Sequence, residues 1–153
     1  MESHTLKQVK EMNDWKVTRA AFNAIFEKYR SYKAAVNFRA KEATITPAYV
    51  PRYHGATNAT SDQTAEIAIY NVDNQIERQT YCEKIETAVS ELEEDEKKII
   101  CERYMKRSRV LDYVVFKHVM DPAICERTYS KIRKKSFDKL LLMLEDMEVT
   151  IDV

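Results

Sequence analysis

Four cationic side chains near the carboxyl end of the 153-residue chain stand at spacings that could place them along one helix. Arg127 and Lys131 are one helical turn apart, and Lys134 and Lys135 follow within the next turn. Arg and Lys can donate two hydrogen bonds to the edge of a guanine, and lysines farther along a helix can pair with phosphates. These residue types indicate contact with duplex DNA, with Arg127 and Lys131 as the candidates for base edges.

The stretch from Asp121 to Leu144 predicts the helix that carries these cations. Apolar or small residues recur in it at intervals of three and four, so one face can pack inward. The expected inward positions are Tyr129, Ile132, Ser136, Leu140 and Leu144. Val110 to Met120 predicts a short preceding helix, with inward positions at Leu111, Val114, Val115, His118 and Val119. A short helix, a turn and a basic helix in this order are typical of a DNA-binding helix-turn-helix.

The composition predicts an all-α fold. The chain holds one Gly and three Pro, too few for a sheet with tight hairpins, while long runs of Glu, Lys, Arg, Ala and Ile favour helices. A hydrophobic content of 44% in 153 residues is enough for one core, in one domain or in a small domain with an extension.

The formal net charge of zero is the sum of blocks of opposite sign. Basic residues outnumber acidic ones by ten to five in residues 1–60 and by eleven to five in 101–139. Acids lead by eleven to four in 61–100 and by four to none in 140–153. A phosphate backbone responds to local charge, so the basic blocks are candidates for contacting it. We interpret the acidic run from Glu91 to Glu96 as capping between two helices.

We expect an N-terminal helical segment at residues 1–42, a loop or linker at 43–62 and a helical DNA-binding domain at 63–153. The loop holds two of the three prolines, the only glycine and several Thr, Ser and Asn, so no regular element should cross it. A helix should begin again near Asp62, with apolar residues at near-heptad spacing. Its first half could pair with another helix or pack on the C-terminal helices, and the sequence leaves both open.

Other classes of function find little support in the sequence. No run of about 18 apolar residues exists, so no membrane span is expected. Cys82, Cys101 and Cys125 are odd in number and widely spaced, which fits reduced thiols in a cytoplasm better than a disulfide frame or a zinc site. No HExxH, Walker-type loop, GxSxG or Cys/His pair is present. We therefore expect a cytoplasmic protein that is not an enzyme and uses no metal or cofactor.

Three motifs follow one another from Tyr81 onward. The motifs are YCEKIETAVSELEEDEKKIICERYM, then LDYVVFKHV, then ERTYSKIRKKSFDKLLLML. The matching residues of the first motif are Ile85-Glu86, Ala88-Val89, Leu92, Lys98-Ile99-Ile100 and Arg103-Tyr104. Those of the third motif are Thr128-Tyr129 and Ile132-Arg133. In this order they resemble the ArpU/RinA family of phage and prophage transcriptional regulators, whose C-terminal part is similar to region 4 of bacterial sigma factors. Together with the loop, the resemblance covers about residues 43–145.

The resemblance implies a sigma region 4-like helix-turn-helix and extends the set of contact residues. Matching to that region places Glu126, Thr128 and Ser130 where bases and phosphates are contacted. Glu126 can accept a hydrogen bond from cytosine, although an acid also repels phosphate. Two arginines in the connector add phosphate contacts. The predicted DNA-binding set is Arg107, Arg109, Glu126, Arg127, Thr128, Ser130, Lys131, Lys134 and Lys135.

The turn of this sequence departs from the family pattern. A Ser or Thr usually caps the recognition helix, and Cys125 holds that place here. Either Asp121 caps the helix with Pro122 in the first helical position, or both belong to a longer turn and Ile124 packs into the core. We favour the second arrangement.

The leading hypothesis is a phage or prophage-encoded transcriptional regulator in the bacterial cytoplasm that binds promoter double-stranded DNA and activates late genes, as the resemblance implies. Because one module makes few base contacts, we expect a homodimer or help from RNA polymerase. A second hypothesis makes bacterial RNA polymerase the main partner of a sigma-like factor. A third, from another class, is an oligomeric phage packaging or assembly protein whose helix-turn-helix serves assembly.

Overall fold

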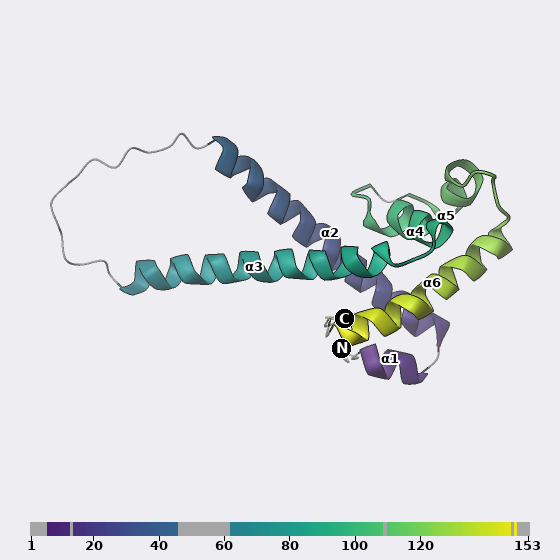
Figure 1. The fold of residues 1–153 in the computed structure, drawn as a ribbon, viewed down its shortest axis with the longest axis horizontal. Coiled ribbons are helices and arrows are strands. Elements are labelled where there is room, and N and C mark those ends of the chain that lie inside the picture. Colours follow the sequence, from purple (N-terminus) through teal and green to yellow (C-terminus); the bar gives the residue numbers. More distant parts are fainter. Residues whose placement is uncertain (1–5, 13, 46–61, 109, 148, 150–153) are drawn as a thin grey trace.

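The computed structural model describes residues 6–12, 14–45, 62–108, 110–147 and 149, and the side chains of all of these but 39–45 and 62–69. Every regular element in these residues is a helix, which confirms the predicted all-α class (Figure 1). The elements are α1 (Leu6–Met12), α2 (Trp15–Ile45), α3 (Asp62–Ser90), α4 (Glu94–Ile100), the π-helical η1 (Cys101–Met105), α5 (Asp112–Val114), the π-helical η2 (Val115–Val119) and α6 (Glu126–Asp146).

The two long helices, α2 and α3, run antiparallel, and the short helices gather around one end of the pair (Figure 1). The buried face of α2 repeats once per turn. It consists of Ala21, Phe22, Ile25, Phe26 and Tyr29. Among the α3 residues whose side chains are described, the buried ones start at Tyr81, whereas Val72 and Ile76 are more than half exposed. The second half of α3 therefore packs within the chain, and pairing of its first half with another helix stays a prediction.

The main hydrophobic core contains side chains from both the N-terminal and the C-terminal helices. Phe137 of α6 stacks on Phe22 of α2 with ring centroids 4.4 Å apart, and Phe26 lies 5.4 Å from Tyr104 of η1. Buried side chains of α1 belong to the same core. The N-terminal segment thus shares its interior with the C-terminal helices. The predicted linker bounds of 43–62 are wrong at their start, because residues 43–45 continue α2, whereas α3 begins at Asp62 as predicted. Residues 46–61 lie outside the part of the chain that the structure describes.

A second, smaller core lies under the helix-turn-helix segment. Val115 and Phe116 of η2 pack there with Met120 of the turn, and the ring of Tyr129 in α6 lies 5.6 Å from that of Phe116. Ile99 of α4 completes the cluster. Helix α6 therefore spans both cores, with its first half on the small core and its second half on the main one.

The inward face predicted for the basic helix is confirmed. Tyr129, Ser136, Leu140 and Leu144 are at most 1% exposed, and Ile132 is partly buried against the small core. The predicted cations lie on the other faces, because this spacing separates the two sets by their angle around the helix.

The inward face predicted for the preceding helix is wrong at two positions. Leu111 is 61% exposed, because it precedes the first turn in extended backbone with φ −75° and ψ 149°. His118 is exposed as well. In η2 the amide of Met120 donates to the carbonyl of Val115, five residues back, and this wider turn rotates His118 away from the face that α-helical spacing predicts. Phe116 is buried instead.

Glu96 in the first turn of α4 ties that helix to α6, and its side chain is only 2% exposed. It accepts hydrogen bonds from the amide of Glu93 at 3.3 Å and from Nζ of Lys139 at 2.8 Å, while Nζ of Lys135 lies 3.3 Å from its other oxygen. Burial raises the pKa of Glu96, but the hydrogen bonds from Lys139, Glu93 and Lys135 outweigh burial and leave the pKa below its usual range. The predicted capping acid is therefore also a tertiary contact.

We expect Glu96→Gln to lower the free energy of unfolding by about 1.5–3 kcal/mol, because the charge-assisted hydrogen bonds to the buried carboxylate are lost while both lysines stay in solvent. Glu94→Gln removes an exposed acid from the same turn and should cost less than about 1 kcal/mol. Urea denaturation followed by circular dichroism measures both variants. Since the folded-state pKa is lowered, the contribution of Glu96 is present above the ordinary Glu pKa and is lost as the pH falls through the folded-state value. Equal losses in the two variants would contradict this assignment.

Candidate nucleic-acid interface

The turn before α6 has the second of the two arrangements considered from the sequence. Helix α6 begins at Glu126, with Cys125 in the N-cap position in extended backbone. The amide of Ile124 donates to the carbonyl of Phe116 at 3.0 Å, and the Ile124 side chain packs on the small core. The interpretation in which Asp121-Pro122 belongs to a longer turn is therefore confirmed, and Glu126 leads the helix.

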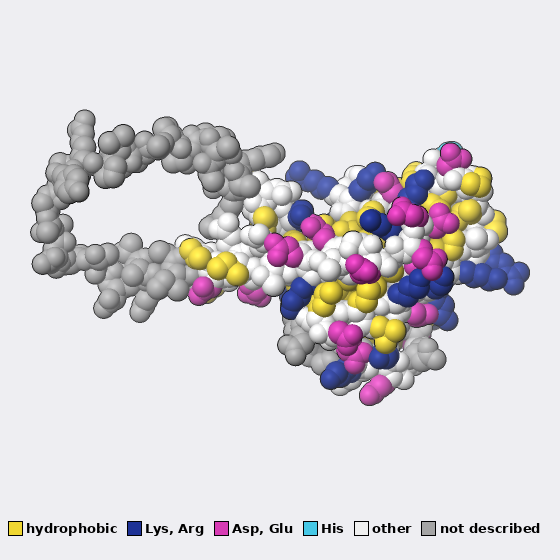
Figure 2. All heavy atoms as spheres, in the orientation of Figure 1, with side chains coloured by type: hydrophobic (Ala, Val, Ile, Leu, Met, Phe, Trp, Pro, Cys, Tyr) yellow, Lys and Arg dark blue, Asp and Glu magenta, His cyan; other side chains and the backbone are white. Residues whose placement is uncertain are grey.

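Three cations form an exposed ridge along the first half of α6. Arg127, Lys131 and Lys134 are all exposed, and none of them makes an ion pair with another described residue. We call these three residues the α6 ridge. Lys and Arg side chains gather at the right edge of the space-filling view, where α6 begins (Figure 2). The ridge is therefore open to an anionic partner.

The other predicted contacts on α6 have different surroundings. Glu126 and Thr128 are exposed, and Ser130 is partly buried. Lys135 is 58% exposed but turns toward α4, where its Nζ lies 3.2 Å from Glu93. Its charge is already compensated by carboxylates, so Lys135 is a weaker phosphate candidate than the ridge residues.

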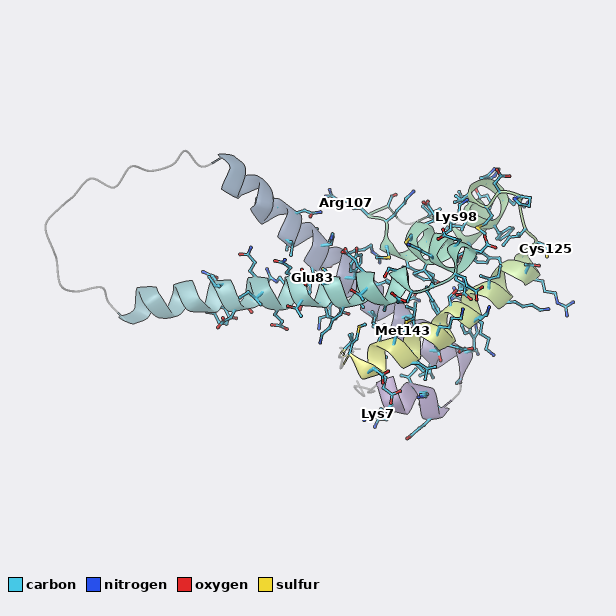
Figure 3. The ribbon with its side chains drawn as sticks, viewed as in Figure 1. Lys7, Glu83, Lys98, Arg107, Cys125 and Met143 are labelled. Carbon is cyan, nitrogen blue, oxygen red and sulfur yellow. The ribbon has the colours of Figure 1, made fainter. Side chains whose placement is uncertain are left out.

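The basic connector does not extend the ridge. Arg107 is exposed, but it lines a groove with residues of α2 that include Arg30 and Lys33. Arg107 and Cys125, which precedes α6, lie at opposite sides of the group of short helices (Figure 3). Arg109 lies outside the described residues. The structure therefore separates Arg107 from the residues at the start of α6 that we predict to contact bases.

A network around Asp112 holds α6 in place, and we did not predict it from the sequence. One carboxylate oxygen of Asp112 accepts from Nε of Arg103 at 2.5 Å and from the hydroxyl of Tyr129 at 3.2 Å. The other oxygen accepts from Nη1 of Arg133 at 2.8 Å. Arg133 is 6% exposed, and its guanidinium lies 5.5 Å from the Trp15 ring centroid and 5.1 Å from that of Tyr129.

The electrostatics of this network favour a charged Asp112, a charged Arg133 and a neutral Tyr129. Burial raises the pKa of Asp112, but the hydrogen bond from Arg103 and the charge of Arg133 outweigh it, so the pKa lies below its usual range. Burial and the nearby Asp112 raise the pKa of Tyr129, which keeps its hydroxyl protonated as a donor. A signal for this network is present in the sequence: Arg133 lies one turn after Tyr129 on the inward face, where a charge needs a partner.

Within the described residues, no group of three or more His, Cys, Asp or Glu is placed to hold a metal ion. Among the same residues, no helix is both long enough and apolar enough to cross a membrane. Comparison of the chain with protein-family models, with curated proteins and with solved structures found no match.

We expect Asp112→Asn to lower the free energy of unfolding by about 2–4 kcal/mol, because Arg133 and Arg103 lose their carboxylate. The folded-state pKa of Asp112 is lowered, so its contribution is present above the ordinary Asp pKa and is lost as the pH falls through the folded-state value. The stabilities of wild type and variant, from denaturant titrations at neutral and acidic pH, should therefore converge on acidification. Asp138→Asn, which removes an exposed acid from α6, is the control. A difference that stays constant with pH would refute the pairing.

We expect Cys125 to be the first of the three cysteines to react with iodoacetamide at neutral pH. Its side chain is exposed, and its pKa is lowered by the Thr128 hydroxyl, 3.1 Å from Sγ, and by the Thr128 amide. Burial raises the pKa of Cys82 and Cys101. Since the thiolate is the reactive form, peptide mass spectrometry after limited labelling should find Cys125 modified first. Thr128→Ala should slow this labelling, and earlier modification of Cys82 or Cys101 would count against the assignment.

Proposed function

We propose that this protein binds double-stranded DNA with α6 as the recognition helix and acts as a transcriptional regulator. The observation that carries the proposal is the α6 ridge: three exposed cations, unpaired within the described chain, on a helix held from behind by two cores. A short helical segment and a turn precede this helix, as in DNA-binding helix-turn-helix units. The resemblance to phage and prophage regulators adds activation of late genes to the proposal.

The chemistry of α6 fits a major groove. An α-helix fits into this groove, and residues near its first turns reach the base edges. Arg127 and Lys131 can donate to guanine, Thr128 can bond a base edge or a phosphate, and Lys134 meets the phosphates. Glu126 can accept from cytosine, which would favour particular sequences and weaken binding to others.

We propose that exposed apolar residues of the α2–α3 pair contact a second copy of the chain. Phe38, Tyr70, Val72 and Ile76 are each more than half exposed within one chain. Each base contact contributes about 1–3 kcal/mol of discrimination, so two recognition helices in a dimer would raise specificity. We therefore include a homodimer in the proposed function and assign its contact to this distal part of the hairpin.

The direct test compares matched double variants in DNA binding. Duplexes selected from a random pool, and promoter fragments, are titrated by fluorescence anisotropy at low salt. Arg127→Ala with Lys131→Ala should weaken binding to the selected sequence by about 30-fold or more, because two base contacts are lost. Lys7→Ala with Lys98→Ala removes the same charge from exposed positions on α1 and α4 and should have little effect.

The outcomes separate the proposed function from its alternatives. Failure of the wild type to bind any duplex at low salt, where phosphate contacts are strongest, would exclude independent DNA binding. Promoter binding that requires RNA polymerase would favour a sigma-like factor. A large ring in light scattering, with DNA binding unchanged in the ridge variant, would favour an assembly protein.

A further inference from the structure

An open groove of about 640 Å³ lies between the start of α2 and the first half of α6. It is lined by Trp15, Glu126, Arg127, Ser130, Lys131, Arg133 and Lys134. The groove includes the whole α6 ridge, and the single side chain of Trp15, at the start of α2, forms its opposite wall. That wall was not among the DNA contacts predicted from the sequence.

Trp15 is held firmly in this wall and presents an unused donor. Its ring lies 5.7 Å from that of Phe137 and 5.5 Å from the guanidinium of Arg133. No described residue accepts a hydrogen bond from its indole N–H. Trp15 is only partly buried, so this N–H is accessible and free to donate to an acceptor that binds in the groove.

The floor of the groove carries an uncompensated positive charge. Arg103 and Arg133 share the single carboxylate of Asp112, so the network has one cation in excess. Nε of Arg133 is buried and has no acceptor in the described part of the chain. A buried excess charge is costly, and an anion close to it offsets the cost. The excess positive charge of Arg103 and Arg133 therefore strengthens the attraction of the groove for an anion.

The mouth of the groove is cationic as well. The three ridge residues, Arg127, Lys131 and Lys134, face one acid, Glu126, and the hydroxyl of Ser130 supplies a further neutral donor. A phosphodiester carries one negative charge and offers two unbridged oxygens as acceptors. The negative charge of the phosphodiester can offset the excess positive charge of the Asp112 network, and one of its oxygens can accept a hydrogen bond from the indole N–H of Trp15.

We propose that this groove binds a backbone phosphate of the DNA whose major groove α6 enters. The assignment rests on the proposed function and deepens it. The start of α2 then belongs to the DNA interface, with Trp15 donating to a phosphate oxygen and Lys134 pairing with its charge. Trp15 contributes to affinity for every sequence, because a phosphate carries no base information.

Trp15 is the only tryptophan of the chain, so its fluorescence reports directly on the groove. Titration of the full-length protein with a duplex should change the emission in step with binding measured by anisotropy. Lys134→Gln should reduce the slope of log Kd against log salt by about 0.9, as expected for one lost phosphate contact. Lys7→Gln, on the far face of α1, should leave the slope unchanged (Figure 3).

Trp15→Phe provides a second test, because it keeps the aromatic packing and removes only the donor. It should weaken binding by about tenfold on selected and unrelated duplexes alike, since a hydrogen bond to a charged group is lost. Circular dichroism establishes that each variant is folded.

The outcomes distinguish failure of the groove assignment from failure of the proposed function. DNA binding with unchanged Trp15 emission and an unchanged salt slope in Lys134→Gln would overturn the groove and leave the proposed function intact. Absence of any DNA binding would overturn both. A saturable emission change with inorganic phosphate alone, and none with duplex, would overturn the assignment to DNA.

Discussion

The pairing of Asp112 with Arg103 and Arg133 is the interaction on which the arrangement of the carboxyl-terminal helices depends. Asp112 opens a helical segment, α5 with η2, that is too short to be stable alone in water. Its carboxylate joins that segment to η1 through Arg103 and to α6 through Arg133. Tyr129 adds a neutral hydrogen bond to the same oxygen as Arg103. The three helical segments that present the candidate interface therefore meet at one carboxylate.

The two halves of helix α6 have different surroundings. Its second half lies in the main core, where Phe137 stacks on Phe22, and its side chain Lys139 pairs with the buried Glu96. Its first half rests on the small core through Tyr129 and leaves its outer faces in solvent. Because one continuous helix joins both halves, the packing of the second half orients the exposed first half. This rigidity is what a DNA-reading helix requires.

The spacing of residues along the chain was enough to predict an all-helical fold, but it could not predict every side-chain orientation or ion-pair partner. The scarcity of Gly and Pro and the apolar repeat around Tyr129 predicted an all-α chain and the inward face of α6. The same rule failed at His118, because a π-helical turn changes the number of residues per turn. Lys135 was predicted to meet phosphate, yet it pairs with Glu93, which is 42 residues away in the chain.

The helical class and the separation of cationic from apolar faces in α6 were predictable from the sequence, since both follow from side-chain types at helical intervals. Which cations are paired and which are free depends on the tertiary packing, because the carboxylates that pair with Lys135 and Lys139 lie at α4. The tertiary packing also decided that Arg107 faces α2 and that Trp15 stands beside the ridge. Those placements depend on how the two cores pack, and packing joins residues that no local pattern relates.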